Sequence, residues 1–252
     1  MSQAIGGRRL FIDVTLVPAE IGEHQALQDC AVIVIDVLRA TSTIITALDA
    51  GASSVVTVAD VEEARTLAKA LGEGAVLGGE RGGIALPGFA LGNSPLEYTA
   101  DKVAGKTVIL TTTNGTYTLH RSSSAAAVAV AAFINLDAAV DWGAQKLRQG
   151  AKLLLACAGT RRRFSWEDAC CAGAILGRLR QELSGSVETS DGALAAEQLW
   201  IAAGRDPQRV LNSSSHGANL LRLGFADDIA YCAQLSCTDS VPQLRDKRLV
   251  LE

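Results

Sequence analysis

Short apolar runs alternate with stretches of helical periodicity along most of the chain. The runs are rich in Val, Ile, Leu and Ala at consecutive positions, which is typical of strands buried on both faces of a sheet. We expect strands over Leu10–Val14, Val32–Asp36, Ser54–Val58, Ala75–Leu77, Thr107–Thr111, Ala127–Ala131 and Lys152–Ala156.

Between these runs, apolar residues recur at the three- and four-residue spacing of helices that pack on a sheet. Ser165 is the expected N-cap of the longest helix, with Asp168 three positions on as an imperfect capping box. After about residue 184 the pattern is mainly helical. The helices we expect before it are Ser42–Ala50, Val61–Leu71, Pro95–Val103, Thr116–Arg121, Leu136–Gln149 and Trp166–Leu183.

This alternation predicts an α/β protein of three layers, α/β/α, in which helices cover both faces of a mostly parallel or mixed central sheet. The chain has 252 residues, no linker rich in Pro, Gly and Ser, and no sequence repeat. A single domain over residues 1–252 is therefore favoured, with a division near residues 104–105 as the alternative.

Composition narrows the class of partner. The net charge is −4, aromatic residues make up 4%, and residues 161–163 are the one cluster of basic side chains, so we expect no nucleic-acid partner. The N-terminus lacks an apolar signal region and no apolar run is long enough to cross a bilayer as a helix, so we expect a cytoplasmic protein without a membrane partner. None of the six cysteines forms a CxxC pair, and the three histidines are too scattered to suggest a zinc site.

One kind of turn recurs where a strand ends and a helix begins. It is rich in small polar residues and occurs at DVLRATST (36–43), TTTNGT (111–116) and CAGTRRRFSWED (157–168), while NSSSHGAN (212–219) joins two helical patterns. Helix N-termini carry unpaired N–H groups and favour anions, phosphate most commonly. The same residues are ordinary N-caps, so one such turn is not a site, but three together favour an anion-binding rim.

Carboxylates stand in or beside these turns. Asp36 ends an apolar strand, Glu80 lies among glycines in GGERGG, and Glu167 and Asp168 occupy the first turn of a helix. A buried carboxylate needs a cation or hydrogen-bond donors. Asp36, Glu80 and Asp168 could therefore hold one Mg²⁺ with a substrate phosphate, although Glu167 and Asp168 could instead merely complement a helix dipole.

Two arginines accompany the carboxylates. Arg39 follows Asp36 within the first turn, and Arg81 follows Glu80. Guanidinium groups clamp anions through paired N–H bonds, so both are candidates for binding anionic substrate groups. The structural alternative is that Arg39 pairs with Asp36 as an ion pair.

Cys157 and Arg163 share the C-x5-R spacing of cysteine-dependent phosphatases, in which a thiolate attacks phosphorus. Ala156 precedes the cysteine where that family has His, and Phe164 follows the arginine where it has Ser or Thr. We keep this mechanism as a minority alternative. No Walker A loop is present: Gly105-Lys106-Thr107 matches its last three positions, but Ala100 stands where the motif needs its first Gly.

The motifs DVLRATST, GERGG, GNSP (92–95), TTTNGT, CAGTRRRFSWEDACCAG and SHGANLLRLGFADDIAYCAQLSCTDSVP, taken in this order, resemble the 2-phosphosulfolactate phosphatase family. They span residues 36 to 242. The resemblance implies a family-specific α/β fold and a magnesium-dependent acid phosphatase. Such an enzyme hydrolyses (2R)-2-phospho-3-sulfolactate to 3-sulfolactate and phosphate, a step toward coenzyme M.

The candidate site follows from the residues and the resemblance together. Mg²⁺ on Asp36, Glu80 and Asp168 would polarise the phosphate, and Asp36, Glu167 and Asp168 are the expected catalytic residues. Glu167 or a hydroxide held by the metal would activate water. The expected substrate-binding residues are Arg39, Thr41, Ser42, Thr43, Arg81, Asn93, Ser94, Thr113, Asn114, Gly115, Thr116 and Ser165.

Two other functions remain open at this stage. The same groups suit other phosphorylated 2-hydroxy acids, such as phospholactate or phosphoglycolate. A non-catalytic anion-binding protein of this fold would bind phosphate without turnover. Either protein would take a small anionic partner, and a homodimer is compatible with the sequence.

Overall fold

The computed structural model describes residues 9–21, 27–183 and 187–252. Within them the strands form one 11-stranded sheet in the order β5-β4-β6-β3-β11-β10-β7-β2-β8-β1-β9. The strands are β1 (Leu10–Thr15), β2 (Cys30–Ile35), β3 (Ser54–Thr57), β4 (Ala75–Arg81), β5 (Ile84–Ala85), β6 (Thr107–Thr111), β7 (Ala127–Ala131), β8 (Lys152–Cys157), β9 (Val187–Thr189), β10 (Gln243–Arg245) and β11 (Arg248–Val250).

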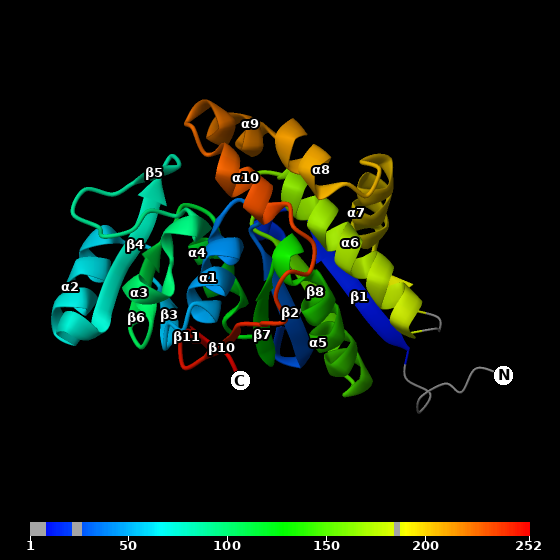
Figure 1. The fold of residues 1–252 in the computed structure, drawn as a ribbon. Helices are drawn as coiled ribbons and strands as arrows, with labels where there is room; N and C mark the ends of the chain where they lie inside the picture. The colour runs from blue at the N-terminus through cyan, green and yellow to red at the C-terminus, as the bar shows by residue number, and fades with distance from the viewer. Residues whose placement is uncertain (1–8, 22–26, 184–186) are drawn as a thin grey trace.

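Helices cover both faces of this sheet, which confirms the predicted three-layer α/β/α class. Figure 1 shows α8, α9 and α10 together at one end of the sheet, beside β5 and the end of α6. No helix in the described part of the chain is both long and apolar enough to traverse a bilayer. The helices are α1 (Ala40–Asp49), α2 (Val61–Leu71), α3 (Ala100–Val103), α4 (Gly115–Ser122), α5 (Leu136–Arg148), α6 (Trp166–Leu183), α7 (Asp191–Ala202), α8 (Pro207–Ser213), α9 (Ser215–Arg222) and α10 (Ala226–Cys232).

The sheet consists of two parallel parts joined by a hairpin. Strands β4, β6 and β3 are parallel to one another, as are β7, β2, β8, β1 and β9. The hairpin β10–β11 lies between them, where β11 pairs antiparallel with β3 and β10 pairs antiparallel with β7. Its turn residues Asp246 and Lys247 have φ of 46° and 65°, the left-handed conformation that tight two-residue hairpins require.

Alternating side chains of the central strands supply two separate cores. Ile33 and Ile35 of β2 face α5, α6 and α7, in a cluster that includes Trp142, Ile175 and Trp200. Val32 and Val34, the neighbours between them, face the opposite layer with α1 and α4. Burial on both faces explains why β2 is apolar throughout, and its first polar side chain appears only where the strand ends.

Most predicted elements are present, and the exceptions have physical reasons. All seven predicted strands and the helices Val61–Leu71 and Trp166–Leu183 are confirmed. The predicted helix Pro95–Val103 is wrong as one element, because a 3-10 turn (Pro95–Glu97) and α3 are separated by extended backbone at Thr99. Strand β4 continues through Glu80 and Arg81, beyond the predicted end at Leu77. Strands β5, β9, β10 and β11 were not predicted, because each is too short to show a period.

Candidate functional site

A narrow pocket forms where both parts of the sheet meet the C-terminal helices. Its volume is about 10 Å³, roughly the space of one water molecule. Residues of three predicted polar turns contribute to it: the turns that precede α1, α4 and α9. The lining residues are Asp36, Leu38, Arg39, Glu80, Gly83, Asn93, Thr112, Asn114 and His216.

Asp36 lies between two helix N-termini. It follows β2, and its Oδ1 accepts a hydrogen bond from the N–H of Ala40, at 3.4 Å, while the N–H of Gly115 also points to the carboxylate. A Cβ on Gly115 would stand 2.8 Å from Oδ2 of Asp36, so glycine is needed for this approach. Burial, reinforced by the charges of Glu80 and Glu167, raises the pKa of Asp36 to about 7.

Asp168 and Glu80 are each bonded to backbone N–H groups from two segments. Asp168 accepts from Val37 N at 2.9 Å and Gly159 N at 3.0 Å, which ties the turns after β2 and β8 together. Burial and the neighbouring charges of Asp36 and Glu167 raise the pKa of Asp168. Glu80 accepts from Gly83 N at 2.7 Å and Thr113 N at 3.0 Å.

The structure does not bring the three carboxylates predicted to hold Mg²⁺ together as one cluster. The described residues contain no group of three or more His, Cys, Asp or Glu side chains placed to hold one ion. Asp168 is turned to the backbone of two loops, while Asp36 and Glu80 line the pocket. Mg²⁺ commonly binds one or two carboxylates together with water and substrate phosphate, so two carboxylates at the pocket still suit it.

Asn93 supplies a further oxygen to the same pocket. Its side chain is buried, and its Oδ1 accepts no hydrogen bond from any residue that the structure describes. A buried polar atom without a partner is costly unless a ligand satisfies it. An amide oxygen beside two carboxylates is a hard-oxygen donor set, and it fits a magnesium ion.

Arg39 is fixed by three contacts. Its guanidinium forms a buried ion pair with Asp228 of α10, donates to the carbonyl of Gly83 at 2.9 Å, and stacks over the ring of Phe225 at 4.2 Å. Ser94 donates to the other oxygen of Asp228 at 2.6 Å. The suggested Arg39–Asp36 ion pair is thus wrong, since Asp228 is the partner.

The hydroxyl groups in the first turn of α1 donate hydrogen bonds to backbone carbonyls. Thr41 donates to the carbonyl of Asp36, Ser42 to that of Val37 at 2.8 Å, and Thr43 to that of Asn93 at 2.9 Å. All three side chains are buried. They shape the rim of the pocket. To donate to a phosphate, as predicted, each hydroxyl would first have to break its hydrogen bond to a backbone carbonyl.

The turn before α4 has a similar internal network. The hydroxyls of Thr112 and Thr116 lie 3.2 Å apart, and Thr113 donates through both N–H and hydroxyl to Glu80. The amide oxygen of Asn114 accepts from Arg161 N at 2.9 Å, which leaves its NH₂ group as a donor at the pocket wall. Asn114 lines the pocket, and its role in binding substrate stays a prediction.

Two other predicted residues lie apart from the pocket lining. Arg81 is exposed and donates to the carbonyl of Ala59 and the hydroxyl of Thr111. Ser165 accepts from Asp168 N at 3.4 Å, which confirms it as the N-cap of α6. The structure therefore gives Arg39 rather than Arg81 as the arginine of the pocket.

His216 is a site residue that sequence reasoning missed. It lies in the first turn of α9 and lines the pocket, with its Nδ1 3.7 Å from Oε1 of the buried Glu167. Burial lowers the pKa of His216, while the charge of Glu167 opposes this effect. The signal was present in NSSSHGAN, where a titratable ring follows an N-cap serine.

The cysteine mechanism finds no support in the geometry. Cys157 is fully buried, and burial together with the charge of Asp168 raises the pKa of its thiol well above the ordinary value. A thiol in this environment does not supply a thiolate nucleophile. Arg163 is exposed, and its backbone pairs with Thr160.

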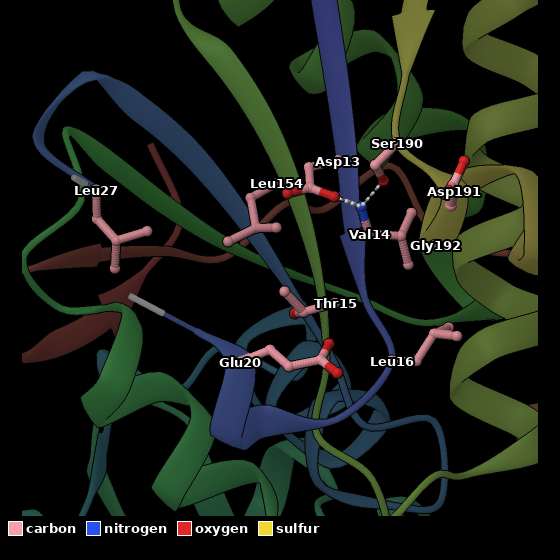
Figure 2. A pocket seen from close by; sticks show the side chains of 10 residues that line it. All are labelled: Asp13, Val14, Thr15, Leu16, Glu20, Leu27, Leu154, Ser190, Asp191 and Gly192. Atoms are coloured by element: carbon pink, nitrogen blue, oxygen red, sulfur yellow. Dashed lines mark hydrogen bonds between the residues drawn. The ribbon is translucent and has the colours of Figure 1, made fainter. Parts of the chain in front are cut away.

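A larger cavity of about 400 Å³ lies at the end of β1 (Figure 2). Val14 N donates to the carboxylate of Asp13 at 2.8 Å and to the hydroxyl of Ser190 at 3.4 Å, the two dashed lines of Figure 2. The described lining includes the carboxylates of Asp13, Glu20 and Asp191 and no basic side chain. Such a wall repels anions, so this cavity does not suit a phosphate ester.

Comparison with known proteins gives one consistent family. A sequence model described as 2-phosphosulpholactate phosphatase matches residues 15–247. A probable 2-phosphosulfolactate phosphatase of Carboxydothermus hydrogenoformans is 44% identical over 243 residues, 96% of this chain and 97% of the relative. Similar proteins of the same printed name occur in Thermotoga maritima, at 41% identity over 96% of this chain and 99% of the relative, and in Synechococcus sp., at 45% over 86% and 89%. All pocket-lining residues fall inside the matched range.

Proposed function

Because the chain belongs to the 2-phosphosulpholactate phosphatase family, we propose that it hydrolyses (2R)-2-phospho-3-sulfolactate to 3-sulfolactate and phosphate, with Mg²⁺ as cofactor. The chain is an enzyme of the phosphoric monoester hydrolase class. One observation carries the magnesium part of the proposal. The buried amide oxygen of Asn93, without a partner among the described residues, lies in the same pocket as the carboxylates of Asp36 and Glu80.

The balance of charge in the pocket supports a cation. Asp36 and Glu80 are buried in its lining and Glu167 is buried behind His216, whereas the positive charge of Arg39 is already matched by Asp228. A substrate that carries a phosphate, a sulfonate and a carboxylate would add further negative charge. Anion binding at such a wall is favourable only if a cation offsets the carboxylates.

The residues then take distinct roles. Asp36, Glu80 and Asn93 would hold Mg²⁺, which would act as a Lewis acid on the phosphate. Arg39 orients an anionic group of the substrate through the N–H groups that Asp228 and Gly83 leave free. The NH₂ group of Asn114 donates to a substrate oxygen. Asp168 holds the turns after β2 and β8 in register and so positions Asp36.

The test is release of phosphate from 2-phosphosulfolactate, 2-phospholactate and phosphoglycolate, each with Mg²⁺ and with EDTA. We expect turnover with Mg²⁺, a preference for phosphosulfolactate, and loss of turnover in EDTA. Turnover that persists in EDTA would contradict the magnesium assignment. A preference for phospholactate or phosphoglycolate would contradict the substrate, and phosphate binding without any release would favour the anion-binding alternative.

Three wider statements belong to the same proposal. Hydrolysis of phosphosulfolactate would place the enzyme on the route to coenzyme M, which growth of a deletion strain with and without added sulfolactate would test. A homodimer is expected, and light scattering measures it. A cytoplasmic location is expected, and fractionation of the host cell measures it.

A further inference from the structure

We propose that His216 is the general acid of the reaction. Its Nε2 gives a proton to the ester oxygen of the substrate as the phosphate departs, and Glu167 is a positioning residue that holds the imidazole ring from the other side. This inference rests on the proposed function, because it names the group that serves the leaving oxygen in the same site.

The position of His216 carries the inference. The ring belongs to the pocket wall together with Asp36, Arg39 and Glu80. Its Nδ1 faces Oε1 of Glu167 at 3.7 Å, so Nε2 is the nitrogen left for the pocket. Catalytic hydrogen bonds are often this long without substrate and shorten when it binds.

The turn that carries His216 is closely packed. Ser214 caps α9 by accepting from Gly217 N at 2.9 Å. A Cβ on Gly217 would stand 1.8 Å from the carbonyl oxygen of Leu211, so glycine is required for α8 and α9 to meet at this angle. The close packing fixes the start of α9, and with it the backbone position of His216 at the pocket.

The charged groups around the ring allow it to change protonation state. Burial lowers the pKa of His216 most, and the charges of Arg39 and Arg161 lower it further. Glu167 of α6 and Glu80 of β4 act in the opposite direction. The protonated ring that the proposed step needs is therefore favoured by the two glutamates and opposed by burial and the two arginines.

The proposed step balances in atoms and electrons. Hydrolysis forms a bond from phosphorus to a water oxygen and breaks the bond from phosphorus to the ester oxygen. The electron pair of the broken bond remains on the ester oxygen, and the proton from Nε2 of protonated His216 converts it to the hydroxyl of sulfolactate. The attacking water loses one proton to solvent, and His216 regains one from solvent, so the enzyme returns to its starting state.

The experiment compares two leaving groups in the His216→Asn variant. The alkoxide of sulfolactate needs a proton to leave, whereas the phenolate of 4-nitrophenyl phosphate does not. We expect kcat on phosphosulfolactate to fall by about 10²- to 10⁴-fold, the usual contribution of general acid catalysis, and kcat on 4-nitrophenyl phosphate to fall by less than about tenfold. His216→Gln serves as a second variant if the first does not fold.

Two further variants complete the design. His120→Asn is the matched control, because His120 is exposed in α4 and its Nε2 faces the carbonyl of Thr57; we expect it to leave both rates unchanged. Glu167→Gln should shift the alkaline limb of the kcat–pH profile to lower pH, because the charge that raises the pKa of His216 is gone.

Equal losses on both substrates in the His216 variants, or no loss on either, would overturn this inference while leaving the proposed function intact. An unmodified enzyme that releases no phosphate from phosphosulfolactate would overturn the proposed function, and this inference with it.

Discussion

Replacing Asp36 with Asn should abolish turnover and yet make the folded protein more stable at alkaline pH. The side chain is only 5% exposed, and burial with the nearby charges of Glu80 and Glu167 raises its pKa from 3.8 to about 7. The folded state therefore binds the proton more tightly than the unfolded state does. A neutral amide of the same shape avoids burying the negative charge.

The size of the effect follows from the pKa. A rise from 3.8 to about 7 corresponds to about 4 kcal/mol against the charged form, at about 1.4 kcal/mol per pH unit. With a raised folded-state pKa, wild-type stability is full below pH 4, falls as the pH rises through this window, and reaches its minimum above pH 7. The introduced amide has one oxygen where the carboxylate has two, so it loses part of the contact with Ala40 N and Gly115 N. We expect the variant to be about 2 kcal/mol more stable than the wild type at pH 8, and this difference to be about 3 kcal/mol smaller, and so reversed in sign, at pH 4.5.

Urea unfolding in EDTA at pH 4.5 and pH 8 measures this gain for the wild type and the Asp36→Asn variant. Asp141→Asn is the control, since Asp141 is exposed on α5 and its replacement should give the same small change at both pH values. Adding Mg²⁺ at pH 8 should raise the urea midpoint of the wild type and not that of Asp36→Asn. A stability difference that does not change with pH, or a substituted protein that is less stable than the wild type at pH 8, would refute the reasoning.

Three other substitutions test separate parts of the site by phosphate release. Gly115→Ala should lower kcat by at least about tenfold, since its Cβ would stand 2.8 Å from the Asp36 carboxylate. An unchanged kcat would show that catalysis does not need the close approach of the Gly115 backbone to Asp36. Asp228→Asn should lower kcat/KM by about tenfold or more, because Arg39 loses the charge of its buried partner, and a normal kcat/KM would separate this ion pair from the reaction. Cys157→Ala should keep kcat within about twofold, and loss of activity in a folded variant would revive the cysteine mechanism.

The local sequence was sufficient to predict the helices that have capping residues and the elements that show a clear hydrophobic periodicity. Helix α2 begins and ends where the sequence predicts, because Asp60 accepts from the N–H groups of Glu62 and Glu63 and Gly72 ends the helix at φ 59°. Helix α6 and the seven longer strands were predicted for the same reason. Strands β9, β10 and β11 have only three residues each, so no period marks them, and β9 pairs with a strand far away in the sequence.

The site was predictable where a polar residue interrupts an apolar strand end. Asp36 and Arg39 were singled out on this basis, Glu80 was singled out because glycines surround it, and all three line the pocket. The sequence could not predict which acceptor each hydroxyl chooses, because Thr43 donates to the carbonyl of Asn93 across a tertiary contact. Nor could it predict Asp228, whose helix shows no polar signal that sets it apart from its neighbours.

The hairpin β10–β11 has a consequence for the order of events during synthesis. It pairs with β3 and β7, which leave the ribosome well before it, so each parallel part of the sheet can form while the hairpin is still absent. The pocket takes Glu80 and Asn93 from one part and Asp36 from the other. The hairpin therefore acts as a bridge: it supplies the strand pairing that joins the two parts of the sheet from which the pocket takes its groups.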